Sequence, residues 1–359
     1  MNNNSNSKIT IYDIAKELGL SPGTIGHALN GTGRIGANTQ KRVVQAAARM
    51  GYRPSLIAKS LSKNRTYTLG VVAPIIGNTA YSAMVSGIES VAYNAGYNII
   101  LCCSEFNQRR ETQYLEMLRD RRVEGIVIIP SRRVISYKEQ IDHLLKIENS
   151  GLPVVVLEQN IAQDNLTKII MDNHSGAKKI VNHLIGLGHK RIGFLHMGTE
   201  DTDFAGNERF AGYKEALFDA GLCFSEELNA QASSISEYEC DTYDQAQFKD
   251  YYEAAGRPSA VFAVCDTLAI KIIRACNMIG LRVPDDIAVV GFDNIAVSGL
   301  LTPPLTTVHQ PAVEMGKRAA DLALGRIDGR LECSVTEKLQ GKLIVRQSCG
   351  AASKSKVRG

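Results

Sequence analysis

The chain has 359 residues, of which 44% are hydrophobic and 22% are charged. These ordinary globular proportions exclude a mainly disordered protein, and the length predicts about two to three domains with a sizeable core. The polar start, MNNNSNSKIT, and the lack of an apolar run long enough to span a bilayer predict a cytoplasmic protein without a membrane segment.

Cysteine spacing gives no sign of a metal site. The sequence contains eight cysteines, with no C-x-x-C pair and no Cys/His spacing that suits zinc. We expect reduced thiols, and we expect neither a metal ion nor another cofactor.

Charge is distributed unevenly along the chain. Residues 1–65 contain ten Lys and Arg against two acidic residues, a net charge of +8, whereas the whole chain carries +4. A basic N-terminal segment suits contact with a polyanion such as DNA, since each Lys or Arg at a phosphate releases condensed counterions. A solubilising basic face is the alternative that charge alone leaves open.

The first predicted elements are two short helices in the stretch TIYDIAKELGLSPGTIGHALNG. Thr10 and Asp13 form a capping-box-like start for the first helix, and Gly19 ends it. Ser21 suits the N-cap of the second helix. Pro22 fits the first helical position, because the amide that proline lacks would be unsatisfied there in any case.

A third helix is predicted from about residue 38 to Gly51, where apolar residues recur at helical spacing. Three short helices with so tight a turn between the first two are typical of a helix-turn-helix. In that motif the second helix presents its N-terminal residues to the major groove of DNA. We therefore predict a DNA-binding head over residues 1–53.

A hinge is predicted over residues 54–66. In YRPSLIAKSLSKN, Pro54 blocks continuation of the third helix, and an apolar pattern at helical spacing follows it. A helix this short is barely stable alone, so we expect it to form when the protein docks on DNA.

From Thr68 the sequence alternates apolar runs with helical patterns. The predicted strands are TLGVVAP, YNIILCCS, GIVIIP, PVVVLE, RIGFLHM, AVFAV and IAVVGF. The helical stretches between them include residues 82–95, 112–120, 174–187, 208–220 and 268–279. Continuous apolar strands with helical crossovers predict an α/β core built on doubly wound parallel sheet.

Several motifs follow one another in a specific order. The first three motifs along the chain are TIYDIAKELGLSPGTIGHALNG, KRVVQAAARMGYRPSLIAKSLS and LGVVAP. They are followed by RFAGYKEAL, VPDDIAVVGFDN, PPLTTVHQP and LIVRQS. In this order, over almost the whole chain, they resemble the lactose/galactose repressor (LacI/GalR) family of transcriptional regulators. The resemblance implies a helix-turn-helix head, a hinge helix and a periplasmic-binding-protein-like core over residues 67–350.

The resemblance also implies that the chain crosses three times between two subdomains of the core. We place the crossings near residues 160–168, 308–312 and 338–342. The resulting segments are an N-subdomain of about 67–162 and 311–338, a C-subdomain of about 163–309 and 340–350, and a polar tail of 351–359. A ligand would bind between the subdomains, outside the carboxyl ends of the strands.

DNA contacts are assigned by the same resemblance. In the family the two positions after the N-cap serine usually carry polar side chains that touch base edges, whereas this chain has Pro22 and Gly23. Proline offers only an apolar surface, for instance to a thymine methyl, so base readout should fall more heavily on Thr24 and His27. An ordinary solvated role for His27 is the alternative. The expected phosphate contacts are Tyr12, Ser21 and Asn30.

In the hinge, the resemblance makes Leu61 an apolar wedge that enters the minor groove and kinks the duplex. Lys59 lies beside it in the sequence and suits the phosphates. The alternative is that Leu61 rests on the core.

Polar side chains at predicted strand ends are the candidates for effector binding. They are Glu158, Gln159, Cys265, Asp266 and Asp293, joined by Arg209 at a helix start and by Asn78 and Tyr81 after the first strand. A carboxylate accepts from two adjacent hydroxyls and a guanidinium donates to several oxygens, so we expect a carbohydrate or a sugar derivative. Tyr81 would cover a ring face.

Two positions depart from the pattern of sugar-binding members of the family. These often have Asp-Arg where this chain has Glu158 and Gln159, and usually Asn where it has Cys265. The departures remove one cation and one amide. A non-sugar effector, such as a nucleobase, or a protein corepressor is therefore the alternative.

Catalytic motifs are missing from the sequence. It contains no P-loop, no G-x-S-x-G, no H-E-x-x-H and no Gly-rich dinucleotide loop after a strand, so we do not expect an enzyme. A free-standing solute-binding protein would share the core, but the basic head counts against it. We predict a homodimeric repressor that binds a pseudo-palindromic site in double-stranded DNA and responds to a small molecule.

Overall fold

The computed structural model describes residues 9–52, 65–131, 137–161, 165–197, 204–232 and 245–351. The chain divides into two units, a head that ends at Thr66 and a core that begins at Tyr67. The predicted hinge contacts Lys59 and Leu61 lie outside the described residues, so both stay predictions.

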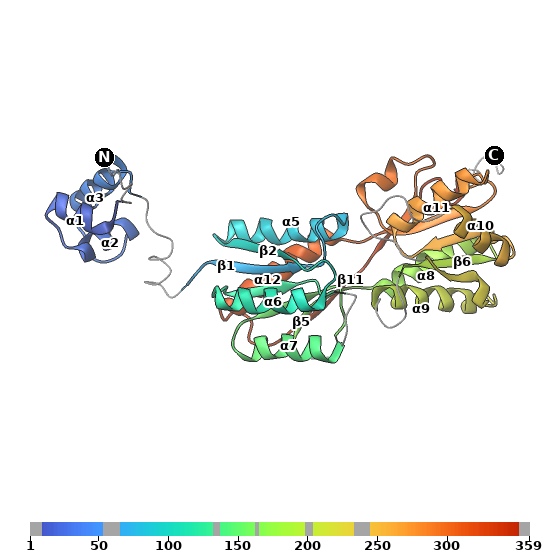
Figure 1. Ribbon diagram of the computed structural model, residues 1–359, viewed down its shortest axis with the longest axis horizontal. Helices are drawn as coiled ribbons and strands as arrows, with labels where there is room; N and C mark the ends of the chain where they lie inside the picture. Colours follow the sequence, from blue (N-terminus) through green and yellow to red (C-terminus); the bar gives the residue numbers. More distant parts are fainter. Residues whose placement is uncertain are drawn as a thin grey trace, which may run out of the picture. The chain divides into compact units, whose positions relative to one another are not determined.

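The head contains three short helices in its described part (Figure 1). They are α1 (Ile11–Leu18), α2 (Pro22–Asn30) and α3 (Ala37–Arg49). Ile14, Ile25 and Val43, one from each helix, are fully buried and form the centre of a separate small core. Each such side chain stabilises the fold by about 1.5–3 kcal/mol. So small a core makes the helix caps important to the head.

The predicted caps of α1 and α2 are confirmed. The Asp13 carboxylate accepts hydrogen bonds from the Thr10 amide at 2.8 Å and from the Thr10 hydroxyl at 2.7 Å, which lowers the pKa of Asp13. Gly19 ends α1 in the left-handed region, at a φ of 65°. Ser21 Oγ accepts from the Thr24 amide at 3.1 Å and caps α2. The tight turn is therefore fixed by local contacts alone.

The first sheet of the core has six strands in the order β11-β5-β4-β3-β1-β2. All its neighbouring strands run parallel. The strands are β1 (Thr68–Ala73), β2 (Asn98–Cys103), β3 (Gly125–Ile128), β4 (Val154–Leu157), β5 (Thr167–Met171) and β11 (Thr336–Leu339).

Helices cover both faces of this sheet. They are α5 (Thr79–Asn94), α6 (Gln108–Asp120), α7 (Tyr137–Asn149) and α12 (Ala312–Ile327). Val71 and Val155 pack in the core that includes α5 and α12, whereas their neighbours Val72 and Val156 pack with α6 and α7. This alternation follows from the two-residue repeat of a strand and makes the subdomain doubly wound.

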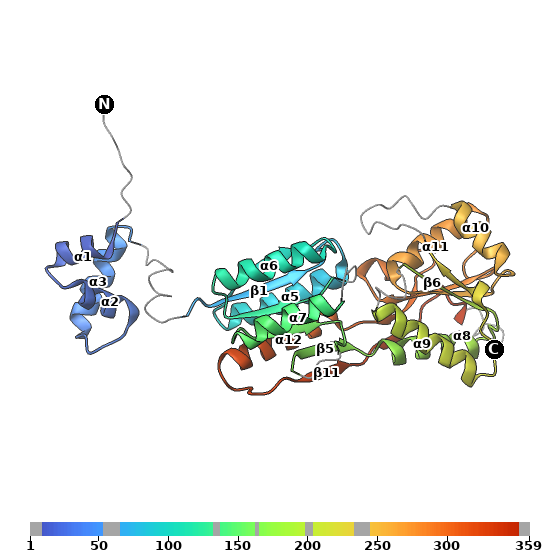
Figure 2. The ribbon, with the colours of Figure 1, turned by 60° about the horizontal axis from the view of Figure 1, so that its bottom comes forward.

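The second sheet has the order β12-β10-β9-β8-β6-β7, and in it only β12 runs antiparallel to its neighbour. Its strands are β6 (Ile192–His196), β7 (Asn229–Gln231), β8 (Ala260–Ala263), β9 (Ala288–Asp293), β10 (Thr306–His309) and β12 (Lys342–Ile344). Its helices are α8 (Asn173–Gly186), α9 (Phe204–Asp219), α10 (Gln245–Ala254) and α11 (Asp266–Met278). Figures 1 and 2 show α8 and α9 on one side of this sheet and α10 and α11 on the other. The predicted architecture of two doubly wound subdomains is confirmed.

Strand β5 corrects the predicted position of the first crossing. It lies in the first sheet between β4 and β11, so the chain leaves that subdomain after Met171 and not within residues 160–168. Lys168 interrupts the apolar run, but it is buried in the sheet because its Nζ donates to the Ile161 carbonyl at 2.7 Å. The other two connections pass through residues 310–311 and 340–341.

Asp172 ties the first connection to the third. Its carboxylate accepts from Gln340 Nε2 at 2.7 Å, forms an ion pair with Lys338 Nζ at 3.1 Å and caps α8 by accepting from the Ser175 amide at 3.2 Å. Lys338 belongs to the first sheet and Ser175 to a helix of the second subdomain. These contacts therefore restrain the relative movement of the two subdomains.

Acid is expected to weaken the core through Asp172. Burial raises the pKa of this carboxyl. The hydrogen bonds from Gln340 and Ser175 and the contact with Lys338 lower the pKa by more than burial raises it, so the pKa falls from 3.8 to about 2. Because the folded pKa is depressed, the stabilisation is complete above about pH 4 and is lost as the pH falls towards 2. The difference is worth about 2 kcal/mol. Urea unfolding at pH 6 and pH 3 should show Asp172→Asn losing this pH-dependent part.

The exposed carboxylate Asp120 provides the matched control. Asp120→Asn should keep the wild-type change in unfolding free energy between pH 6 and pH 3. A wild-type pH dependence in Asp172→Asn as well would contradict the role of Asp172 at the crossings.

Candidate functional site

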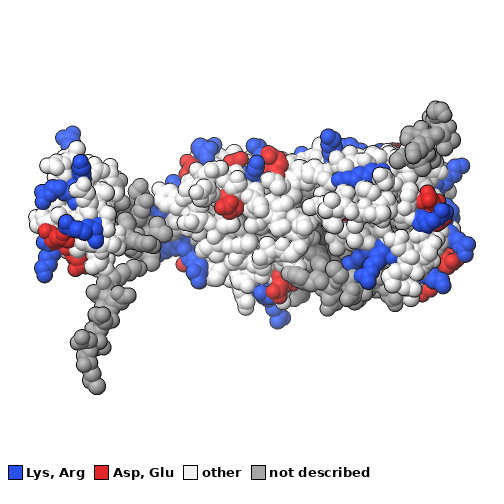
Figure 3. Space-filling model, turned by 90° about the horizontal axis from the view of Figure 1, so that it is seen from above, with Lys and Arg blue, Asp and Glu red and all other residues white. Residues whose placement is uncertain are grey.

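The head presents an exposed basic surface. Residues 9–52 contain five Lys and Arg, all exposed, against Asp13 and Glu17. Figure 3 shows Lys and Arg side chains on the head beside a smaller acidic group. Arg49 pairs with Glu17, and the remaining excess of positive charge suits contact with DNA phosphates.

The predicted DNA contacts other than Lys59 and Leu61 lie on α1, on α2 and in the turn between them. Tyr12 is 70% exposed on α1, and Asn30 is the last residue of α2. Thr24 Oγ1 lies 2.9 Å from Ser21 Oγ, so both hydroxyls take part in the cap of α2. His27 is exposed, and its Nδ1 lies 3.1 Å from Thr32 Oγ1, which orients the ring.

Pro22 and Gly23 occupy the first two positions of α2. A Cβ added at Gly23 would meet only Ser21 Oγ, at 3.8 Å, so packing of the head leaves room for a larger residue there. The missing side chain at the second position of α2 is therefore a property of the exposed surface and not a requirement of the fold.

A cavity of about 330 Å³ lies in the core, at the carboxyl ends of the strands of the second sheet. The second subdomain contributes residues that follow β6 and β8, the end of β9, one residue of α9 and one face of α11. The first subdomain contributes the turn that leads into α5. The cavity thus has walls from both subdomains, as ligand sites between doubly wound sheets do.

Four of the predicted effector residues line this cavity: Asn78, Arg209, Cys265 and Asp293. Glu158 and Gln159 line a separate small recess together with Phe204. The structure therefore brings the cation and one carboxylate of the predicted set to a single place.

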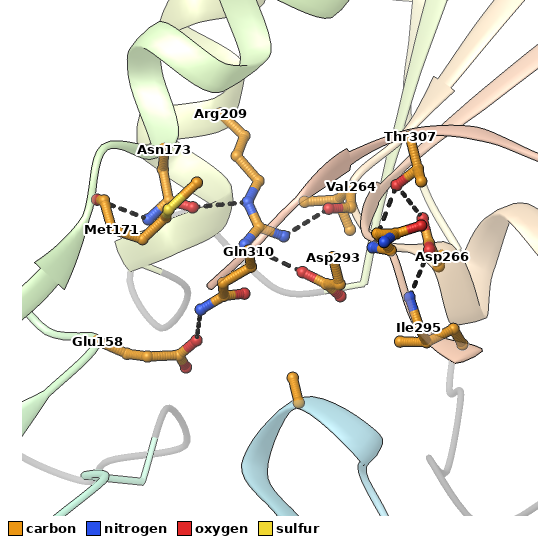
Figure 4. A network of polar contacts seen from close by, with 12 residues as sticks. Glu158, Met171, Asn173, Arg209, Val264, Asp266, Asp293, Ile295, Thr307 and Gln310 are labelled. Carbon is orange, nitrogen blue, oxygen red and sulfur yellow. Dashed lines mark hydrogen bonds and ion pairs between the residues drawn. The ribbon is translucent and has the colours of Figure 1, made fainter. Parts of the chain in front are cut away.

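Arg209 is buried and held by several groups (Figure 4). Its Nε donates to Asn173 Oδ1 at 2.8 Å, and another guanidinium nitrogen donates to the Val264 carbonyl at 2.7 Å. Asp293 forms an ion pair with it at 3.4 Å, and the guanidinium lies 3.8 Å from the centre of the Phe292 ring. A buried charge needs such compensation, and these contacts fix the guanidinium in one orientation.

The backbone at the end of β9 is strained. Asp293 has a φ of 112° and Asn294 a φ of 57°, both in the region that favours glycine. Arg346 donates to Asn294 Oδ1 at 2.7 Å and holds this turn. Strain of this kind collects at functional sites, and here it aims the Asp293 carboxylate towards Arg209.

Asp266 and Tyr81 require corrections to the predicted ligand contacts. Asp266 has no exposed surface. Its carboxylate accepts hydrogen bonds from the hydroxyls of Ser298 and Thr307 and from the Ile295 amide. It holds the loop that follows Asp293 and does not face the cavity. Tyr81 is 1% exposed and packs in the core under α5, so its ring is not available to cover a ligand.

Glu158 and Gln159, which depart from the family pattern, bind protein groups. Glu158 accepts from Gln310 Nε2 at 2.5 Å, and Gln310 belongs to the second connection between the subdomains (Figure 4). Gln159 donates to the carbonyls of Pro130 and Ser131, both at 3.4 Å. Both side chains therefore join the edge of the cleft to neighbouring loops.

Sequence analysis missed one polar face of the cavity. Thr267, Lys271 and Arg274 line it from α11, at intervals of four and three residues. Polar residues at helical spacing in an otherwise apolar helix that follows a strand were the available signal. Sequence analysis also missed Asn173, which orients Arg209.

Two absences hold for the described residues. In those ranges, no group of three or more His, Cys, Asp or Glu side chains could hold a metal ion. None of the helices described there combines the length and hydropathy of a membrane span.

Comparisons with known proteins match both units. Residues 10–55 match the model of bacterial regulatory proteins of the lacI family, and residues 181–349 match that of a periplasmic binding protein-like domain. The HTH-type transcriptional repressor PurR of Vibrio campbellii (strain ATCC BAA-1116) is 33% identical over 339 residues, which cover 94% of this chain and 98% of the relative.

Solved structures match the whole architecture. The Lac repressor dimer bound to operator and the anti-inducer ONPF superimposes with a TM-score of 0.83, at 24% identity over 96% of this chain and 99% of that one. The complex of the transcriptional regulator CelR with cellobiose has a TM-score of 0.68, at 27% identity over 95% of this chain and 99% of that one.

Proposed function

The chain belongs to the LacI family of bacterial regulatory proteins, and we propose that it acts as a homodimeric repressor whose affinity for a pseudo-palindromic operator is set by a small molecule in the core cavity. DNA-binding repression is the activity of the family relatives that it matches along nearly its whole length. The dimer, the symmetry of the operator and the effector are the parts that this proposal adds.

One observation carries the proposal: a separately folded, basic helix-turn-helix head and a core with a two-walled cavity lie on the same chain. A ligand that contacts both walls favours one relative orientation of the subdomains. If that orientation also changes how two heads are presented, ligand and DNA affinities are linked by the same coupling free energy.

Symmetry follows from the size of one head. A single helix in the major groove reads only a few base pairs, so proteins of this type bind as dimers to two half-sites related by a two-fold axis. In the proposed complex Leu61 enters the minor groove and Lys59 meets the phosphates beside it.

The cavity favours a carbohydrate or sugar derivative as effector. Arg209 and Asp293 stand together at its wall and offer donors and acceptors suited to adjacent hydroxyls. None of its described lining residues is aromatic, so these residues offer a planar nucleobase no ring to stack on. The relative CelR, which was solved with cellobiose, supports the same class.

His27→Ala is expected to weaken binding to the preferred operator by about 10–100-fold, because a good base contact contributes about 1–3 kcal/mol of discrimination. Binding to random DNA should change much less. Fluorescence anisotropy of the full chain on both duplexes measures the difference.

Gln45→Ala serves as the matched control, since Gln45 is an exposed polar residue of α3. It should bind both duplexes as the wild type does. If His27→Ala and Gln45→Ala behave alike on the preferred operator, His27 does not read a base.

A further inference from the structure

Among the charged residues in the described lining of the cavity, basic ones predominate. Arg209, Lys271 and Arg274 face it, against the single acidic side chain of Asp293. The ion pair with Asp293 offsets the charge of Arg209. The other basic residues of the described lining, Lys271 and Arg274, both belong to α11.

Lys271 is the less common feature of this face, because only 9% of its surface is exposed. Withdrawing an ammonium group from water is costly unless negative charge or hydrogen-bond acceptors stand nearby. Lys271 and Arg274 both have protein contacts, so a ligand would add to those contacts or exchange with them. Arg274 lies three residues later on α11 and is exposed, at the outer side of the same wall.

The start of α11 also lines the cavity. Its N-cap is Cys265, whose side chain makes no capping hydrogen bond, and Cys265 and Thr267 both line the cavity. The start of α5 differs, because Asn78 Oδ1 already accepts from the amides of Ala80 and Tyr81. The first turn of α11 also contains the buried carboxylate of Asp266, so the partial positive charge of this helix start adds little to that of Lys271 and Arg274.

We propose that the effector is an anionic sugar derivative, a polyol that carries a phosphate or a carboxylate. Its hydroxyls meet the Arg209 and Asp293 pair, and its anionic group lies against Lys271 and the first turn of α11, with Arg274 beside it. A cavity of about 330 Å³ lies at the lower end of the range for ligand sites, which suits a monosaccharide derivative. This inference rests on the proposed function and names the ligand class of the same site.

Titration calorimetry on the full chain tests the inference with matched probes. The neutral probes are glucose and ribose, and the anionic ones are glucose 6-phosphate, glucuronate and ribose 5-phosphate. We expect at least one anionic probe to bind at least about tenfold tighter than its neutral partner, since a charge-assisted contact is worth about 1.5–3 kcal/mol. Lys271→Met should remove this advantage.

Lys249→Met is the control, because Lys249 is an exposed residue of α10 outside the cavity and the substitution removes the same charge. It should leave the affinity for the anionic probe unchanged. If Lys271→Met does not fold, the exposed Arg274→Met, which should weaken the anionic probe by a few-fold, keeps the comparison available.

Three results would overturn the inference: no anionic probe that binds more tightly than its neutral partner, equal affinities in Lys271→Met and Lys249→Met, or no binding by any of the anionic probes. Operator affinity, measured with each probe present, distinguishes a failure of this inference from a failure of the proposed function. A neutral sugar that binds and changes operator affinity contradicts only the anionic class. An anion that binds through Lys271 and leaves operator affinity unchanged supports the ligand class and contradicts the regulatory coupling.

Discussion

Arg209→Met is expected to lower the free energy of unfolding of the core by about 3–5 kcal/mol and to abolish the response of operator binding to the effector. Methionine keeps an apolar side chain but removes the guanidinium that lies over Phe292 and compensates the charge of Asp293. It also removes the donors to Asn173 and to the Val264 carbonyl. The half-buried carboxylate of Asp293 and two buried acceptors would then lack the partners that Arg209 supplies.

Denaturant unfolding of the full chain, followed by circular dichroism, measures the loss of stability. Arg318→Met is the matched control, because Arg318 pairs with Glu337 near the surface of the core and is 44% exposed. An exposed ion pair contributes at most about 1 kcal/mol. If Arg209→Met costs no more than Arg318→Met, the Arg209 network does not hold the cavity in the way described.

The second large effect is expected from Gly316→Ala, which should destabilise the core by about 3 kcal/mol. A Cβ at Gly316 would lie 2.0 Å from the Met84 carbonyl oxygen, and a Cβ at Gly87 would lie 2.2 Å from that of Val313. The contacted atoms are backbone, so α5 and α12 would have to separate. Because α12 begins directly after the second connection and α5 directly after the turn that lines the cavity, the site should be disturbed as well.

Gly325→Ala on the same helix provides the comparison. There the nearest atom to an added Cβ, other than those of the helix backbone, is Leu331 Cβ, at an ordinary 3.6 Å. The replacement should be neutral or should stabilise α12 by about 0.5–1 kcal/mol, since alanine loses less conformational freedom than glycine. Equal thermal melting of the two variants would contradict the close contact between α5 and α12.

Local chemistry explains what the sequence predicted well. The caps at Thr10, Gly19 and Ser21 depend on contacts within a few residues, so the head could be read from its motifs. The seven predicted strands are continuous apolar runs and are all present, and all but the edge strand β2 are largely buried. Strands β5 and β11 were not predicted, because both are short and contain polar residues. The two strands pair with each other at one edge of the sheet.

Side-chain direction explains what the sequence predicted less well. Asp266 and Asp293 both stand where β8 and β9 end, yet only Asp293 faces the cavity, because the loop after β9 folds over Asp266 and supplies it with donors. Asn173 reaches Arg209 from another helix 36 residues away in the sequence. Contacts of this kind depend on tertiary structure and leave no local pattern.

In vitro selection of the full chain on a random duplex library tests the central claim most directly. The proposed function predicts an enriched sequence with two half-sites related by two-fold symmetry, bound in the nanomolar range or tighter. The affinity of the chain for that sequence should change when the effector is added. A library without enrichment, or a single half-site without symmetry, would contradict the account of this chain as a dimeric repressor.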